Sequence, residues 1–210
     1  MQFGLVASLG LAITLGSFAP IPARAQQGDF TWLVEYRDQG ENKLAGDKRF
    51  IPFLQSQLPS TPLPSWENQP VNEAAGTFLW GVPGYIEVRH NRYFSASGCP
   101  AHACVARALL WVDTQSDLVV FIATGEEEDN RNKATRNQYH VGSANLYLAT
   151  KAALDPAALP DELRGAIIRW LHLEGVLNVG TITLLTPSGA QPVTTDQLCW
   201  TGRCAYTRWD

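Results

Sequence analysis

Apolar residues recur in short runs at hairpin spacing through the middle of the chain. Four runs of strand length cover 85–89, 93–97, 105–112 and 118–124. Short polar segments with the composition of turns separate the first run from the second and the third from the fourth. Strands joined in this way pair as hairpins, so the pattern predicts an antiparallel sheet.

Two further segments have helical spacing. Residues 51–58 place their apolar side chains on one face, and Pro52 suits a first helical turn. Residues 160–174 start with Pro160 and two acidic residues and stop at Gly175, as a helix with favourable ends does. We expect both helices to pack on the sheet.

The segments before the first hairpin are expected to be less regular. Residues 30–37 have the pattern of a short strand, and 41–47 that of a turn. Residues 59–70 contain four prolines and predict an extended loop, because proline cannot occupy a central strand. Residues 78–80 are expected to lie in a strand that ends at a turn over 81–84.

Beyond residue 124 the pattern predicts one more strand and a final hairpin. The strand is expected at 144–150, and the hairpin at 179–185 and 191–195 around Pro187-Ser188-Gly189. The expected fold class is therefore α+β, an antiparallel sheet of about five or more strands with flanking helices.

The N-terminus has the pattern of a secretory signal. Phe3 to Leu15 is apolar, and Ala23-Arg24-Ala25 has the small-x-small form of a signal-peptidase site. The apolar run is shorter than the roughly 20 residues that a membrane-spanning helix needs. We expect residues 1–25 to be a signal peptide cleaved after Ala25, and the mature chain to reside in the periplasm without a membrane anchor.

The charge balance is mildly acidic, with 16 basic and 20 acidic residues and a net charge of -4. Cleavage after Ala25 would remove Arg24 and leave 15 basic against 20 acidic residues, a net charge of -5. A basic surface that tracks phosphates is not expected, which argues against a nucleic-acid partner. The sequence has no glycine-rich phosphate loop, no Gly-x-Ser-x-Gly and no His-Glu-x-x-His, so neither a cofactor nor an enzymatic activity is expected.

Four cysteines form two units of equal spacing, Cys99 with Cys104 and Cys199 with Cys204. In an exported protein they predict two disulfides, and of the three connectivities the spacing favours the two local pairs. The first pair would close a loop between two strands. In the chain-entropy model a cross-link over so short a loop contributes about 2 kcal/mol to stability.

The first cysteine loop encloses one histidine, His102. A zinc site is disfavoured because such sites usually use Cys-x2-Cys steps and exported thiols tend to be oxidised. A nucleophilic or redox-active Cys104 is disfavoured because the nearby Cys99 would consume its thiolate. Two interpretations remain: a structural cross-link beside an incidental surface histidine, which composition favours, or a loop that presents His102 to a partner.

The order of segments around this loop is distinctive. A helix at 51–58 is followed by Leu63-Pro64-Ser65-Trp66, strands, the loop Cys99–Cys104, and Leu109-Leu110-Trp111. This succession resembles the Ivy family, the bacterial periplasmic inhibitors of vertebrate C-type lysozyme. Members of that family pass from a helix through Leu-Pro-x-Trp into strands and a Cys-Lys-Pro-His-Asp-Cys loop, followed by an apolar strand ending near a tryptophan.

The resemblance implies a binding protein whose partner is C-type lysozyme or another muramidase. The lysozyme-binding loop would be Cys99, Pro100, Ala101, His102, Ala103 and Cys104, with His102 reaching the catalytic carboxylates of the enzyme. Pro100 and Ala101 stand where the family has Lys and Pro, and Ala103 stands where it has Asp. Members of the family can also form homodimers.

The resemblance covers about residues 50–124. We therefore expect three parts: the signal peptide, an Ivy-like α+β domain at 26–150, and a helix-hairpin extension at 151–210 packed on the same domain and containing the second disulfide. The alternative hypothesis is a periplasmic envelope protein of the same fold that binds glycan or another protein without inhibiting lysozyme.

Overall fold

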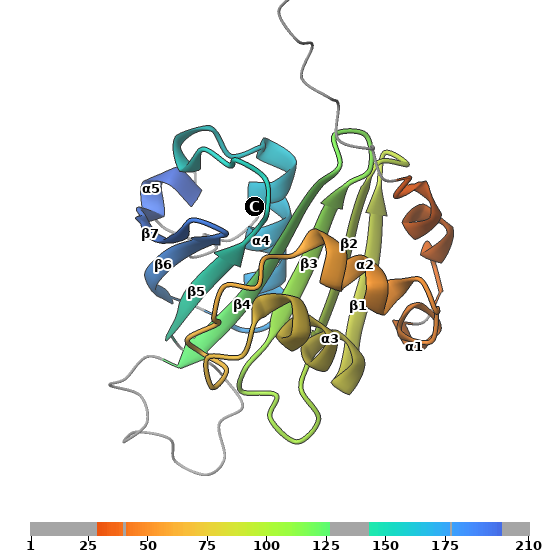
Figure 1. Cartoon of the computed structure of the whole chain (residues 1–210), viewed down its shortest axis with the longest axis horizontal. Helices are drawn as coiled ribbons and strands as arrows, with labels where there is room; N and C mark the ends of the chain where they lie inside the picture. Colours follow the sequence, from red (N-terminus) through yellow and green to blue (C-terminus); the bar gives the residue numbers. More distant parts are fainter. Residues whose placement is uncertain (1–28, 40, 127–142, 177, 199–210) are drawn as a thin grey trace, which may run out of the picture.

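A single mixed sheet organises the chain in the computed structural model, which describes residues 29–39, 41–126, 143–176 and 178–198 (Figure 1). The expected signal peptide, Cys199 and Cys204 lie outside these residues. The sheet has seven strands in sequential order. They are β1 (Val82–Arg89), β2 (Tyr93–Cys99), β3 (Ala108–Asp113), β4 (Leu118–Glu126), β5 (Ser143–Ala149), β6 (Asn178–Thr186) and β7 (Gly189–Val193).

Helices surround the sheet and account for about half of the remaining described residues. They are η1 (Thr31–Tyr36), α1 (Glu41–Ala45), α2 (Phe50–Gln57), α3 (Val71–Gly81), η3 (Pro156–Ala158), α4 (Asp161–Leu173) and α5 (Thr195–Leu198). The α+β class expected from the sequence is confirmed. No helix within the described ranges is both long and apolar enough to span a bilayer.

The hairpin pattern predicted a wholly antiparallel sheet, but the sheet is mixed. Strands β1 to β5 pair antiparallel with their neighbours, and β6 pairs antiparallel with β7, but β5 and β6 run parallel. Helix α4 lies between these two strands in the sequence and carries the chain back to the end of the sheet where β5 began. Parallel neighbours need such a crossover, which a hairpin turn cannot provide.

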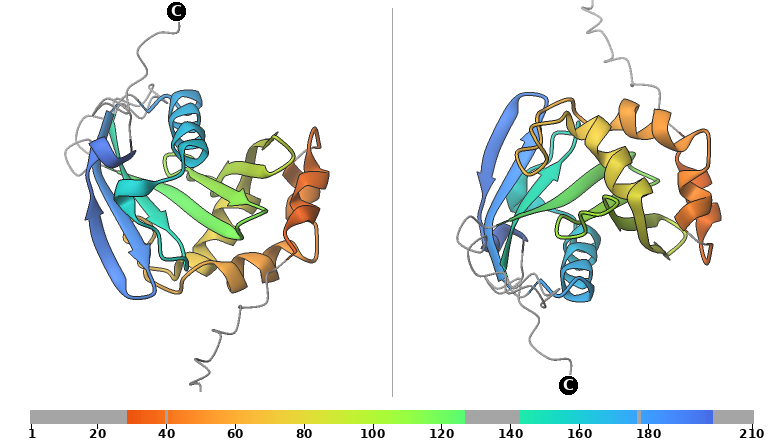
Figure 2. Two further views of the ribbon diagram at one scale, coloured as in Figure 1. Left: turned by 90° about the horizontal axis from the view of Figure 1, so that it is seen from above. Right: turned by 90° about the horizontal axis from the view of Figure 1, so that it is seen from below.

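Both faces of the sheet are covered, α2 and α3 lying on one side and α4 on the other (Figure 2). Strand β3 is buried along its whole length because it contributes to both cores. Leu110 and Val112 join the cluster beneath α2 and α3, whereas Leu109 and Trp111 join the cluster beneath α4. Burial on both faces explains why this strand is a continuous apolar run rather than an alternating one.

Three segments before β1 differ from expectation. Residues 31–36 form the 3-10 helix η1 rather than a strand, and the turn expected at 41–47 contains the short helix α1. Residues 78–80 belong to helix α3, and β1 begins at Val82, inside the expected turn. The apolar positions Val71, Ala74, Ala75, Phe78 and Leu79 recur at three to four residues and are all buried. This helical period is the physical reason for α3.

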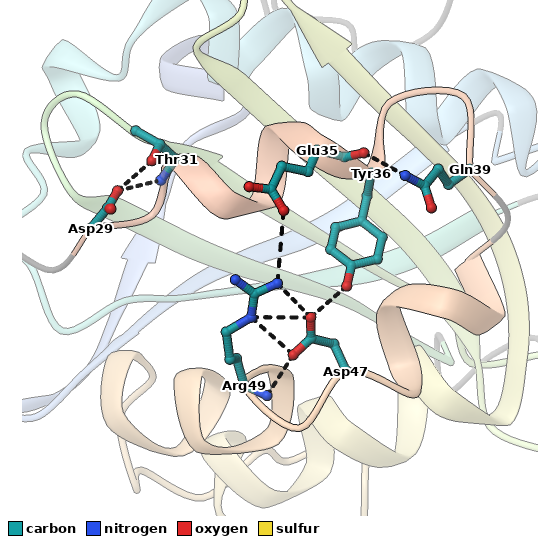
Figure 3. Close-up of polar contacts among 7 residues, drawn as sticks. All are labelled: Asp29, Thr31, Glu35, Tyr36, Gln39, Asp47 and Arg49. Atoms are coloured by element: carbon teal, nitrogen blue, oxygen red, sulfur yellow. Dashed lines mark hydrogen bonds and ion pairs between the residues drawn. The ribbon is translucent and has the colours of Figure 1, made fainter.

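A polar cluster fastens η1 to the segment that enters α2 (Figure 3). Tyr36 Oη and Arg49 Nη2 donate to the Asp47 carboxylate at 2.5 and 2.6 Å. These bonds, from Arg49 first and then Tyr36, hold the pKa of Asp47 well below its usual range. The Arg49 guanidinium also lies 4.4 Å from the centre of the Trp32 ring, a cation–π contact. The cluster therefore has a structural role, because it joins η1 to the start of α2.

Candidate functional site

The connection between β2 and β3 projects beyond the end of the sheet, at the bottom of the view in Figure 1. It begins at Cys99, the last residue of β2, and ends at Ala108. The sulfur atoms of Cys99 and Cys104 lie at disulfide distance, and their Cα atoms are 5.0 Å apart. The spacing predicted that these two cysteines form a local pair, and the distance between their sulfur atoms agrees with that prediction.

His102 lies at the tip of this connection and is exposed. The Ala103 N–H donates to the Pro100 carbonyl at 3.1 Å, which closes a tight turn over residues 100–103. His102 has a φ of +64°, in the left-handed region that non-glycine residues seldom adopt. Pro100 is buried whereas Ala101 and His102 are exposed, so the turn is anchored at one side and presents the imidazole at the other.

Glycines let the loop rest directly on the end of α3. A Cβ built at Gly81 would overlap Ala101 N and Cys99 O, and one built at Gly98 would lie 2.7 Å from Phe78 O. Real Cβ atoms do not approach backbone so closely, so both positions depend on the missing side chain. The base of the loop is therefore packed backbone to backbone on the last turn of the helix.

The other side of the loop is held by β4 and α4. Arg107 N donates to Thr124 Oγ1 at 2.8 Å, and Thr124 N donates to Arg107 O at 2.8 Å. The Arg107 guanidinium forms an ion pair with Glu174, the residue after α4. Both side chains are mostly buried. The stem of the loop is thus tied to the sheet and to both helical layers.

Exposed apolar side chains gather around this end of the sheet. Within the described residues, the large apolar side chains that are exposed are Trp80 at 61%, Val82 at 44%, Val105 at 59% and Leu173 at 64%. Trp80 is in the last turn of α3, and Val82 pairs with Cys99. Val105 follows Cys104, and Leu173 precedes the Glu174 that holds Arg107. We call these four residues the apolar ring. Each of the four side chains is open to contact with a partner.

A groove of about 670 Å³ lies beside the loop, between α2 and α3. Trp66 and Trp80 line it together with Pro100 and Ala101 of the loop. The rest of the lining is partly polar, from Gln55, Asn72, Glu73 and Thr77, and partly apolar, from Ile51, Leu54, Gly76 and Gly81. The groove thus opens next to the tip that carries His102.

The other candidate side chains do not join the loop. His90 lies in the turn between β1 and β2, at the opposite end of β2, with Nε2 3.6 Å from Glu162. His172 is in α4, and His140 lies outside the described residues. Within the described ranges, no three His, Cys, Asp or Glu side chains are grouped as ligands for a metal ion.

The sequence marked His102 and its cysteines but gave no indication of the apolar ring. Trp80, Val82 and Leu173 stand in regular elements among buried apolar residues, so their residue types look the same as those of core positions. Their exposure depends on where α3 and α4 end relative to the sheet. A sequence pattern over one element does not contain that information.

No protein-family model matches this chain. No curated protein and no solved structure matches it either.

Proposed function

We propose that this chain is an exported inhibitor of C-type lysozyme that inserts a disulfide-closed loop, residues 99–104, into the active-site cleft. The observation that carries the proposal is the position of His102. Its side chain is exposed at the tip of a tight turn that projects beyond the sheet. A projecting tip with one imidazole has the shape and the chemistry of a plug for a cleft that contains carboxylates.

The chemistry of lysozyme explains what His102 would do there. The enzyme works with two carboxyl groups, one protonated as the general acid and one ionised. An imidazole between them donates a hydrogen bond to one carboxylate, and to both when it is charged. A nearby carboxylate also favours the charged form of a histidine. The loop would occupy the place of the sugar, and His102 would occlude the site without any turnover.

The apolar ring supplies a surface that can surround such a plug. Trp80, Val105 and Leu173 are each more than half exposed, and Trp80 and Val105 lie beside the loop. Apolar side chains that exclude water around a central polar contact strengthen that contact, and tryptophan is often a major contributor at interfaces. Contact with the rim of the cleft would bury these side chains.

The net charge of the chain also supports the proposal, because it would speed association with a basic enzyme. The chain has a net charge of -4, and the expected cleavage after Ala25 would make it -5. A negative protein is drawn to a basic lysozyme at long range. Ala103 lacks the carboxylate that the Ivy family has at this place. A hydrogen bond to a charged group contributes about 1.5–3 kcal/mol, so we expect weaker binding than an aspartate would give.

The test is a titration of lysozyme activity on bacterial cell walls. Wild type should inhibit a C-type lysozyme, and His102→Asn should raise the inhibition constant about 10- to 100-fold, the loss of one charge-assisted hydrogen bond. Asparagine is a better replacement than alanine, because asparagine tolerates the left-handed backbone at this position and preserves the turn.

His90→Asn is the matched control. His90 is also exposed and also has a left-handed backbone, with a φ of +53°, but it lies at the other end of the sheet. It should inhibit as wild type does. Failure of the wild-type protein to inhibit any muramidase would overturn the proposal, and full inhibition by His102→Asn would overturn the role of the imidazole.

A further inference from the structure

We infer that the groove between α2 and α3 is a binding site for a neutral saccharide. This inference does not depend on lysozyme inhibition, because the groove is built from side chains other than His102. Its volume of about 670 Å³ falls within the range of small-molecule sites, roughly 300–1,000 Å³.

The aromatic side chains of the groove suit the apolar face of a sugar ring. Trp66 is partly buried, and its ring packs against Phe78 with centroids 5.1 Å apart, which holds it in place. Trp80 is 61% exposed, and its ring packs against no other aromatic ring of the described residues. One ring is therefore part of the wall, and the other is available to a ligand.

The floor of the groove is open because Gly76 has no side chain. A Cβ at this position would lie 3.3 Å from Ile51 Cδ1, so α2 and α3 approach closely beneath the groove. Glu73, Gly76, Thr77 and Trp80 are spaced at three to four residues and share one face of α3. The groove thus follows the helix axis, with polar side chains at one end and Trp80 at the other.

The polar side chains offer both donors and acceptors. Gln55 and Asn72 each carry a carbonyl oxygen and an NH₂ group, Thr77 carries a hydroxyl, and Glu73 a carboxylate. Asn72 Oδ1 is itself buried without a partner in the described part of the chain, so the side-chain acceptors open to a ligand are those of Gln55, Glu73 and Thr77. Sugar hydroxyls both donate and accept, so they match such a mixed set.

The charges of the residues that line the groove favour a neutral sugar over an anionic ligand. The described residues that line the groove include one carboxylate, Glu73, and no Lys, Arg or His. A phosphate or a carboxylate ligand would meet repulsion from Glu73 and no cation to offset the loss of its hydration. A neutral ring that stacks on Trp80 and exchanges hydrogen bonds with amides avoids that cost.

The test uses two neutral trisaccharides, one of N-acetylglucosamine and one of glucose, titrated into the full chain by calorimetry. At least one should bind saturably. Trp80→Ala should weaken that binding about tenfold, equivalent to ~1.4 kcal/mol. Tryptophan emission should shift on binding in wild type, and the shift should be smaller in Trp80→Ala.

Leu173→Ala is the control for loss of an exposed apolar side chain, because Leu173 is 64% exposed and lies outside the groove. It should bind the sugar as wild type does. His102→Asn should also bind normally, which separates this site from the lysozyme proposal. Absence of saturable binding of both trisaccharides to wild type, or undiminished binding by Trp80→Ala, would overturn the inference.

Discussion

Arg107 forms an ion pair with Glu174 and thereby joins the stem of the β2–β3 connection to the end of helix α4. The two residues are far apart in sequence, and both side chains are mostly buried. The pair therefore links the projecting loop to the part of the chain that the family resemblance does not cover.

Glu174→Gln should lower the free energy of unfolding by about 1.5–3 kcal/mol, because it leaves the Arg107 charge without its carboxylate. Urea denaturation measures this change. The double variant Arg107→Met/Glu174→Leu removes both charges and should recover part of the loss, as replacing a buried pair by apolar side chains often does. A double variant that is less stable than Glu174→Gln would contradict this account.

Two glycines of α3 should respond in opposite ways to alanine. Gly81→Ala places a Cβ against the backbone of Cys99 and Ala101, so it should destabilise the protein by about 1–3 kcal/mol and disturb the loop. Gly76→Ala meets only the movable end of the Ile51 side chain at 3.3 Å. It should stabilise the helix by about 0.5–1 kcal/mol. Thermal unfolding of both variants tests the contrast, and equal effects would contradict it.

Removal of the link between Cys99 and Cys104 should lower both the stability of the protein and its binding to lysozyme. The double variant Cys99→Ser/Cys104→Ser should lose about 2 kcal/mol of stability in the chain-entropy model. The freed loop would have to be ordered on binding, so lysozyme inhibition should fall although His102 is retained. Denaturation and inhibition are measured on the same preparation. Inhibition equal to that of wild type would show that the loop keeps its shape without the link.

Asp113 should control the stability of the protein in acid. Burial alone would raise the pKa of this carboxyl, but hydrogen bonds from Arg92, Ser116 and the Gln115 backbone together lower it to about 2. Its folded pKa is thus below the ordinary value of 3.8. The stabilisation is present above about pH 4 and is lost as the pH falls towards 2, and it amounts to about 2 kcal/mol.

Asp113→Asn should therefore be less stable than wild type at neutral pH, and the difference should shrink between about pH 4 and pH 2. Denaturation midpoints across this range measure it. Asp38→Asn is the control, because Asp38 is exposed and asparagine tolerates its left-handed backbone. A difference that stays constant down to pH 2 would mean that the Asp113 carboxylate is not the group responsible.

If the chain inhibits lysozyme, salt should slow the association. An acidic chain and a basic enzyme attract one another, and ions screen this attraction beyond about 10 Å at 0.1 M. The association rate constant should fall about tenfold between low salt and 0.3 M, with little change in the dissociation rate constant. Stopped-flow mixing measures both. An association rate that is insensitive to salt would argue against steering by charge.

The sequence predicted the elements whose signals are local. The turns at 90–92 and 113–117 located the hairpins, and Pro160 with Gly175 located α4. Helix α3 was missed because the aromatic and apolar residues at 78–80, followed by Gly81, look like a strand that ends in a turn. Its helical period becomes evident only when the small residues Ala74 and Ala75 are counted as core positions.

The direction of β6 and the apolar ring could not be predicted for a different reason. Whether β6 pairs parallel or antiparallel with β5 depends on where α4 packs, a contact between segments distant in sequence. The same packing decides that Leu173 is exposed while Leu171, two residues before it, is buried. For the loop, by contrast, the cysteine spacing predicted a local pair, and the sulfur atoms of Cys99 and Cys104 do lie at disulfide distance.

Strand β3 gives this loop a fixed register. A shift of β3 by one residue against its neighbours would turn Trp111 towards α2 and α3 and Leu110 towards α4. Both cores would then lose their fit at once, so even a step of about 3.3 Å along the strand is opposed from two sides. Packing deep within the sheet therefore fixes the point at which the chain leaves β2 and enters β3, and with it the place from which a partner would meet the loop that carries His102.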